Sequence, residues 1–257
     1  MPMKFLSNLT PLIKFILILL FLSPSGSFSQ NAYEIVKKAD ELMRTKSSYT
    51  ELTMKIIKPN WTREMSMKVW ALEPDYALIY ITAPARDKGT VTLKRRNEVW
   101  NWLPSAQKVI KIPPSMMLQS WMGSDFTNDD LVRESSVIND YTHKIIGEEK
   151  IDGYDCYKIQ LNPKPEAGVV WSKIITWIAR DSYLQPLTEY YDEDGKVVKK
   201  FIGSELKTMD GKKIFTHWEM IPVDKPGNKT IMDYNKIQFN IKIDQSFFSE
   251  QNMKKVR

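Results

Sequence analysis

Two histidines, one cysteine and several serines are the side chains through which this 257-residue chain could perform covalent chemistry. The one candidate pair of a nucleophile and its general base is Ser124 or Ser120 with His143. No GxSxG motif is present, so the turn that exposes a catalytic serine is not predicted. His143 and His217 fall in separate segments of strand character, where solvated or hydrogen-bonded histidines are the simpler interpretation. Ester hydrolysis stays an alternative, but we do not expect an enzyme.

Cation binding has one candidate cluster, Asp125, Asp129 and Asp130, which could supply oxygen ligands. With Asn128 the same residues also fit the start of a helix before Leu131, and we favour capping. One cysteine cannot form an internal disulfide, and no CxxC or CxxH pattern suggests structural zinc. The sequence also lacks phosphate-binding and dinucleotide-binding glycine motifs, so we expect neither a metal nor a cofactor.

Residues 1–29 have the features of a secretory signal peptide. Lys4 and Lys14 provide positive charge, and residues 15–22 are an unbroken apolar run. Ser27 and Ser29 fit the small-x-small cleavage rule, which predicts a cut after Ser29 and a periplasmic protein. An uncleaved membrane anchor is the alternative, but the run is shorter than the ~20 residues needed to span a bilayer. We expect residues 30–257 to form a single domain.

The charge of the chain is modest. It has 37 basic and 31 acidic residues, a formal net charge of +6, and loss of Lys4 and Lys14 with the signal would leave +4. This charge is too small and too scattered to predict nucleic-acid binding. The densest basic cluster, Lys94-Arg95-Arg96, fits either a solvated hairpin end or a contact with anionic lipid or an acidic partner.

Hydrophobic periodicity predicts one helix followed by many strands. The helix begins near Ala32, has one apolar face, and ends near Lys46-Ser47-Ser48. Asp-Gly pairs at 152–153, 194–195 and 210–211 are typical of hairpin turns. We expect about eleven antiparallel strands, drawn from thirteen runs of strand character: residues 49–57, 62–72, 76–83, 89–95, 98–103, 108–112, 141–151, 154–161, 169–179, 186–193, 196–208, 212–221 and 231–243.

Many neighbouring strands joined by short turns predict a strongly bent sheet, a barrel or half-barrel with a concave face to fill. The first helix and an apolar insertion at residues 113–134 are the candidates to cover it. Pro114 or Ser115 could begin a short helix in this insertion, and Gly123 could end it. Methionine suits surfaces that repack around variable apolar guests, so the cluster from Met116 to Met122 predicts a lid that contacts acyl chains. Simple core filling is the alternative.

Several segments between Val69 and Leu131 resemble the outer-membrane lipoprotein-sorting family, the LolA-like proteins. They are Val-Trp-Ala-Leu-Glu-Pro-Asp-Tyr, Ala-Pro-Ala-Arg-Asp-Lys-Gly, Val-Trp-Asn-Trp-Leu-Pro-Ser and Met-Gly-Ser-Asp-Phe. The resemblance implies a mainly β fold (α+β): an unclosed antiparallel β-barrel with an N-terminal helix and a helical lid. It also implies a hydrophobic cavity that carries lipoprotein acyl chains across the periplasm.

The resemblance also implies site residues. By position, Trp70, Pro74, Trp100, Trp102 and Pro104 match aromatic and proline positions at strand ends. The full set expected to bind lipid or form the lid is Trp70, Trp100, Trp102, Met116, Met117, Leu118, Trp121, Met122 and Phe126.

One position departs from the family pattern. The family places a lid-holding arginine just before the proline that matches Pro74, and here that position is Glu73. Because a carboxylate accepts hydrogen bonds and does not donate them, Glu73 cannot replace that arginine. Arg63 and Arg86 are the candidates to take the role, unless cargo and gating differ.

The leading hypothesis is a monomeric periplasmic carrier for acyl chains of lipoproteins or for phospholipid. Its partners would be an inner-membrane transporter, ATP-driven (ABC) or RND-type, and an outer-membrane acceptor. The alternative is an accessory module of an envelope transporter complex, with no lipid passenger and a cavity filled by its own side chains. The sequence does not choose between lipoprotein and phospholipid as cargo.

Overall fold

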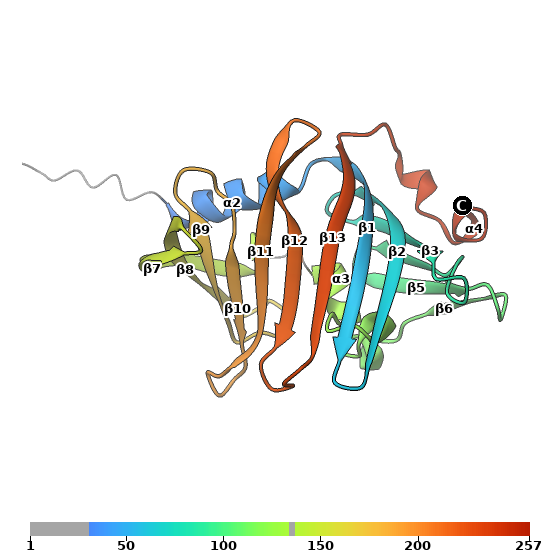
Figure 1. The fold of residues 1–257 in the computed structure, drawn as a ribbon, viewed down its shortest axis with the longest axis horizontal. Helices are drawn as coiled ribbons and strands as arrows, with labels where there is room; N and C mark the ends of the chain where they lie inside the picture. The colour runs from blue at the N-terminus through green and yellow to red at the C-terminus, as the bar shows by residue number, and fades with distance from the viewer. Residues whose placement is uncertain (1–30, 134–136) are drawn as a thin grey trace, which may run out of the picture. The chain divides into compact units, whose positions relative to one another are not determined.

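The computed structural model describes residues 31–133 and 137–257, which leaves the expected signal peptide outside the described residues. All thirteen predicted runs are strands, two more than the expected eleven, and they pair antiparallel in one sheet (Figure 1). The strands are β1 (Ser47–Lys58), β2 (Trp61–Leu72), β3 (Tyr76–Ala83), β4 (Val91–Arg95), β5 (Glu98–Leu103), β6 (Lys108–Lys111), β7 (Tyr141–Ile151), β8 (Tyr154–Pro163), β9 (Lys173–Ala179), β10 (Leu187–Tyr191), β11 (Val197–Met209), β12 (Lys212–Pro222) and β13 (Lys229–Phe239).

Strand order explains why the insertion must cross the sheet. The order is β6-β5-β4-β3-β2-β1-β13-β12-β11-β10-β9-β8-β7, so the first and last strands meet in the middle. Strands β6 and β7 follow one another in the chain but form opposite edges of the sheet. The chain that joins them therefore has to pass from one edge to the other. The remaining connections join neighbouring strands, with two residues between β1 and β2 and nine between β8 and β9.

Turn chemistry agrees with the sequence at two of the three Asp-Gly pairs. Asp152 and Gly153 have φ of 46° and 87°, and Asp210 and Gly211 have φ of 46° and 80°. Positive φ at both residues gives the twist that a two-residue hairpin needs. At the third pair positive φ is confined to Gly195, so that hairpin uses a different turn.

The predicted N-terminal helix is α2 (Ala32–Met43), which ends at least three residues earlier than expected. Its apolar face buries Ala32, Ile35, Val36 and Ala39 against β7, β8 and β9. Val69 on β2 and Ile79 on β3 face the same side of the sheet as this packing, which we call the concave face. In Figure 1, α2 and α3 (Asn128–Arg133) both lie behind the central strands, on that side.

The expected single helix from Pro114 or Ser115 to Gly123 is wrong. Two 3-10 turns occur instead, η1 (Pro114–Met116) and η2 (Trp121–Gly123), and Met122 has a non-helical φ of 53°. Between them the chain makes i→i+3 bonds and then closes a loop through a β-bridge from Ser120 to Thr127. We call residues 113–133 the lid.

The C-terminal segment covers the opposite face of the sheet. It contains η4 (Gln245–Phe247) and α4 (Glu250–Met253), and α4 packs against β4. Phe248, Met253 and Val256 are buried there against Leu78 and Leu93. Residues 32–257 form one compact unit.

Candidate functional site: a lidded apolar cavity

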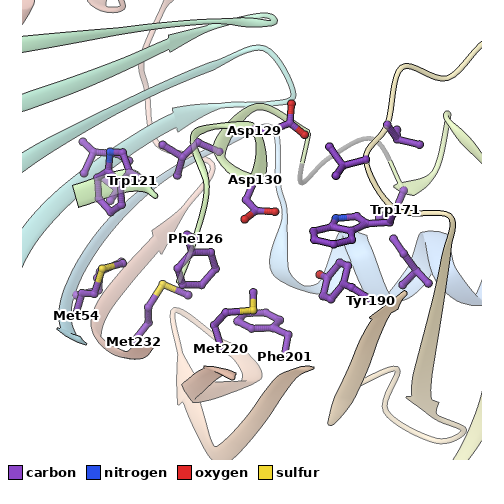
Figure 2. A pocket seen from close by; sticks show the side chains of 18 of the residues that line it. Met54, Trp121, Phe126, Asp129, Asp130, Trp171, Tyr190, Phe201, Met220 and Met232 are labelled. Atoms are coloured by element: carbon purple, nitrogen blue, oxygen red, sulfur yellow. The ribbon is translucent and has the colours of Figure 1, made fainter. Parts of the chain in front are cut away.

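A cavity of about 220 Å³ lies between the concave face and the lid (Figure 2). Its wall is mostly aliphatic, aromatic and thioether side chains, and its two charged members are Asp129 and Asp130. The lining residues are Leu52, Met54, Met67, Val69, Ile79, Trp121, Phe126, Asp129, Asp130, Leu131, Val137, Tyr141, Val169, Val170, Trp171, Ile174, Tyr190, Phe201, Met220, Met232 and Tyr234.

The alternation of side chains along each strand determines which sheet residues line the cavity. Successive side chains point to opposite faces of a strand, so Met67 and Val69 of β2 face the cavity together. Met220 and Met232 enter from β12 and β13, and Phe201 enters from β11 (Figure 2). Because nine strands contribute, no single sequence segment carries the site.

Trp121 anchors the lid to the floor of the sheet. Its side chain is 3% exposed, and its indole Nε1 donates to Thr92 Oγ1 at 3.1 Å. The Trp121 N–H donates to the carbonyl of Phe126 at 2.8 Å, and Ser124 Oγ donates to the Trp121 carbonyl at 2.7 Å. A tight loop therefore presents both Trp121 and Phe126 to the cavity.

Arg63, near the start of β2, joins two separate loops. Its Nη1 donates to the Met122 carbonyl at 3.3 Å, and its Nη2 lies 2.8 Å from Asp87 Oδ2. Arg86 adds a second bond to Asp87 at 3.2 Å. Burial opposes ionisation of Asp87, but the bonds from Arg63 and Arg86 lower its pKa below the ordinary value. Asp87 therefore stays ionised and holds Arg63 against the lid.

This contact brings together the two most distinctive sequence segments. Asp87 belongs to Ala-Pro-Ala-Arg-Asp-Lys-Gly, and Met122 belongs to Met-Gly-Ser-Asp-Phe. Arg63 bridges them although it lies outside both. The pair of segments is thus one structural unit at one end of the lid.

Asp125 ties the same end of the lid to the central strands. Lys58, at the end of β1, forms an ion pair with Asp125 at 2.5 Å, and the Asp125 side chain is 6% exposed. Thr230, at the start of β13, donates to Asp125 Oδ2 at 2.7 Å and accepts from the Asp125 N–H at 2.9 Å. This carboxylate is satisfied within the protein.

Asp130 ties the far end of the lid to β11. Lys199 Nζ lies 2.9 and 2.8 Å from the two carboxylate oxygens, and the Lys199 side chain is 7% exposed. Trp171 and Tyr190 enclose the same ammonium, with ring centroids at 4.5 and 5.1 Å. Asp130 also exchanges hydrogen bonds with Thr127, which caps α3. A capping role is therefore observed, together with an ion pair.

Solved structures with the same fold identify the architecture. A DUF1329 family protein from Desulfovibrio piger superposes with a TM-score of 0.78 at 25% identity, covering 86% of this chain and 97% of that one. A LolA superfamily protein from Nitrosomonas europaea gives 0.73 at 21% identity, covering 86% and 98%. A domain provisionally assigned to outer-membrane lipoprotein sorting, from Vibrio parahaemolyticus, gives 0.76 at 20% identity, covering 87% and 98%.

A family model described as an uncharacterized protein matches residues 73–255, which is well over half of the chain. The chain belongs to the family that this model describes, and its fold is LolA-like. Its unclosed antiparallel sheet is the fold of these solved structures. No curated protein matches the sequence. Among residues 31–133 and 137–257, no helix is both long and apolar enough to cross a membrane.

The lid of this LolA-like protein meets the cavity with part of the predicted cluster. Trp121 and Phe126 line the cavity, and Met122 packs beside them against the core of the concave face. Met116 and Leu118 are 38% and 61% exposed and do not line it. Met117, the remaining member of the cluster, is half-buried, and its carbonyl accepts a hydrogen bond from the Asp129 N–H at 2.8 Å.

Trp70, Trp100 and Trp102 do not line the cavity, which corrects the placement expected from the sequence. They pack on the opposite face of the sheet, in the cluster beneath the C-terminal segment. The reason is alternation: Val69 faces the cavity, so its neighbour Trp70 must face away. Trp70 contacts Phe247 there, with ring centroids 5.5 Å apart.

Of the three gating candidates, Arg63 is the one that reaches the lid. Glu73 lies in the turn between β2 and β3, where its N–H donates to the Lys46 carbonyl. Ten residues of extended strand put Glu73 about 30 Å from Arg63. Arg86 is 69% exposed and acts on Asp87 rather than on the lid directly. Arg63 therefore has the donor geometry expected of a lid-holding arginine, from the other end of β2.

The residues considered for hydrolysis, thiol chemistry and cation binding have other contacts in the structure. Ser124 Oγ donates to the Trp121 carbonyl, while a ring nitrogen of His143 lies 2.8 Å from the Val137 carbonyl, so each has a different partner. Burial raises the pKa of the Cys156 thiol to about 11, which keeps it protonated. Asp125 and Asp130 pair with different lysines instead of converging on a cation.

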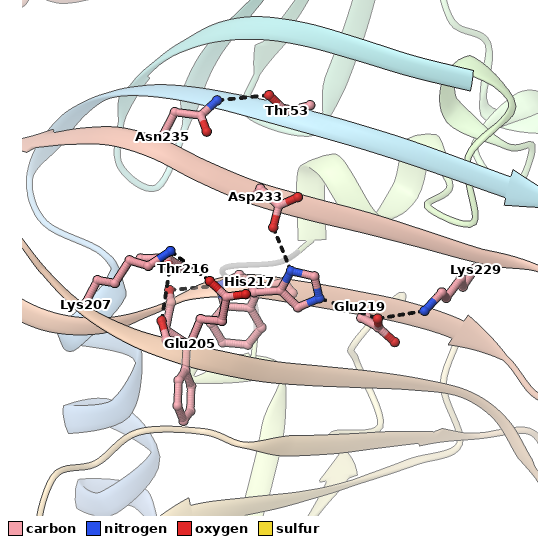
Figure 3. Close-up of polar contacts among 11 residues, drawn as sticks. Thr53, Glu205, Lys207, Thr216, His217, Glu219, Lys229, Asp233 and Asn235 are labelled. Carbon is pink, nitrogen blue, oxygen red and sulfur yellow. Dashed lines mark hydrogen bonds and ion pairs between the residues drawn. The ribbon is translucent and has the colours of Figure 1, made fainter. Parts of the chain in front are cut away.

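The second histidine sits in a polar network across β12 and β13 (Figure 3). His217 Nδ1 lies 2.6 Å from Asp233 Oδ1 and Nε2 lies 3.4 Å from Glu219 Oε1. Lys229 Nζ contacts the same Glu219 at 2.8 Å. Burial opposes protonation of His217, but its bonds to the two carboxylates raise the pKa above 6.5.

We expect this network to make stability depend on pH. Because the folded-state pKa of His217 is raised, the stabilisation is complete below about pH 6.5, the unfolded value, and is lost as pH rises through the folded pKa. His217→Gln should therefore lower the free energy of unfolding more at acidic than at alkaline pH, in urea titrations across that window. An equal loss at every pH would contradict the assignment.

Proposed function

We propose that this LolA-like protein is a periplasmic carrier that binds acyl chains of lipoproteins or phospholipids in the concave-face cavity. The observation that carries the proposal is a mostly apolar cavity whose cover is held by polar contacts. Burying each methylene of a chain there would contribute about 0.8 kcal/mol. Such transfer binds a lipid without catalysis.

The size of the cavity supports a lid that moves. Its volume of about 220 Å³ is below the roughly 300–1,000 Å³ of pockets that hold drug-sized ligands. A complete acyl chain would therefore require displacement of the lid. The lid is held by side-chain contacts of four residues: Lys58, Arg63, Trp121 and Lys199. The lid can therefore move without unpairing a strand of the sheet.

The proposed cargo route follows from the similarity to the Vibrio parahaemolyticus domain, which is named for outer-membrane lipoprotein sorting. We infer that an inner-membrane transporter, of ABC or RND type, loads the protein and that an outer-membrane acceptor receives the cargo. A cleaved signal peptide at residues 1–29 would deliver a monomer to the periplasm. The alternative is an accessory module whose cavity admits no passenger.

Native mass spectrometry of protein purified from a periplasmic preparation tests the proposal. We expect co-purifying lipid on the unmodified protein and reduced occupancy in Phe126→Gln, because Phe126 is half-buried and lines the cavity. Leu206→Gln is the matched control, since Leu206 is 44% exposed on β11 and outside the cavity. Absence of lipid from the unmodified protein, together with failure to take up added phospholipid, would favour the accessory module.

A further inference from the structure

The positive charge of the chain gathers at one end of the sheet. Residues 94–111, from β4 to β6, contain five basic residues and one acid, Glu98; residues 250–257 contain three basic residues and one acid, Glu250. Together these segments carry a formal charge of +6, equal to that of the whole chain. Figure 1 shows β5, β6 and α4 at the same end.

Two tryptophans hold several of these cations on one face. Arg95 and Lys111 lie over the Trp100 ring, at 6.0 and 5.4 Å from its centroid. Lys254 lies over the Trp102 ring at 5.7 Å. Trp100 and Trp102 share a face of β5, so the C-terminal segment and the edge strands form one basic surface. Lys94 is excluded, because it is buried and donates to the Pro74 carbonyl.

Exposed apolar side chains occur in the edge strand β6 and in the segment that follows it. Ile110 of the edge strand β6 is 43% exposed, and Met116 and Leu118, just beyond it in the lid, are 38% and 61% exposed. Lys108 and Lys111 flank Ile110 in the same strand and are exposed. Because β6 ends the sheet, side chains from both of its faces could reach a flat surface that meets this edge.

We propose that this end of the sheet docks on the surface of an anionic phospholipid bilayer. The docking edge consists of the exposed cations Arg96, Lys108 and Lys254 with the apolar residues Ile110, Met116 and Leu118. Lys111 lies beside them and forms an ion pair with Glu98. Cations attract the headgroups while apolar side chains enter the interface, which is the combination that peripheral binding uses. An acidic protein would need the charge but not this solvent-exposed apolar row. The docking edge lies outside the cavity, so it does not depend on the identity of the cargo.

Co-sedimentation with vesicles tests the proposal. We expect binding to vesicles of equal parts phosphatidylglycerol and phosphatidylcholine, weak binding to phosphatidylcholine alone, and loss of binding as salt rises well above roughly 0.1 M. Lys108→Gln/Lys254→Gln should weaken the partition coefficient about 25-fold, at about fivefold for each cation. Leu118→Ser should weaken binding without changing its salt dependence.

The matched control is Lys144→Gln/Lys150→Gln, which removes two exposed cations from β7 at the opposite edge. It should bind vesicles as the unmodified protein does. Equal loss in both double variants, or absence of binding to anionic vesicles, would overturn the proposal. Tighter binding to polyglutamate than to anionic vesicles would assign the edge to an acidic protein instead. Lipid occupancy of the cavity, measured separately, should be the same in both double variants.

Discussion

Trp121→Ala is expected to lower the free energy of unfolding by about 3–5 kcal/mol, the usual loss for a large aromatic residue in a core. Trp121 is 3% exposed and fixes the lid over the concave face. Its loss removes both the buried indole and the hydrogen bond to Thr92, so a bound acyl chain should also dissociate faster. Urea unfolding and release of a fluorescent fatty acid measure the two effects.

Two variants separate packing from the hydrogen bond. Trp121→Phe keeps much of the buried area and loses the indole N–H, while Thr92→Val leaves that N–H without its acceptor. Each should cost about 1–3 kcal/mol, which is less than the alanine variant. If Trp121→Ala changed neither stability nor release, the residue would not be the anchor that its burial indicates.

Asp130→Asn is expected to lower the free energy of unfolding by about 3 kcal/mol, because it leaves the Lys199 ammonium buried without its counter-ion. Asparagine can still accept from the Thr127 N–H, so the cap of α3 is retained. The double variant Asp130→Asn/Lys199→Met should recover most of the loss, since it removes both charges. A double-mutant cycle in urea measures the coupling between the two residues.

The same cycle tests whether this pair acts as a latch. Acyl-chain exchange should be faster in Asp130→Asn than in the unmodified protein, because one end of the lid is released. The control is Lys196→Gln, which removes a lysine of an exposed pair with Asp194 on the same hairpin. Exposed pairs contribute about 0–1 kcal/mol, so the control should change little. Equal exchange in all variants would mean that the pair stabilises the fold without gating it.

Local pattern was enough to predict the strands and the N-terminal helix of this protein, but not the two 3-10 turns of the lid. All thirteen runs of strand character are strands, α2 begins at the expected residue, and two Asp-Gly pairs form the expected turns. Each of these depends on a few neighbouring residues and on the period of their hydrophobicity. The insertion was recognised as unusual for the same reason, since residues 116–122 are too apolar for an ordinary loop.

Tertiary structure decided which face of each strand meets the cavity. A period of two separates Val69 from Trp70 but does not say which one faces the concave side. The pairing of β1 with β13 joins the two halves of the sheet and places β6 and β7 at opposite edges, and it depends on contacts far apart in sequence. That arrangement sends the lid across the sheet, brings Asp130 to Lys199 across 69 residues, and leaves the three tryptophans outside the cavity. The sequence by itself therefore determined the strands, the helix and the lid's apolar character, whereas the cavity and its latches exist only through non-local pairing.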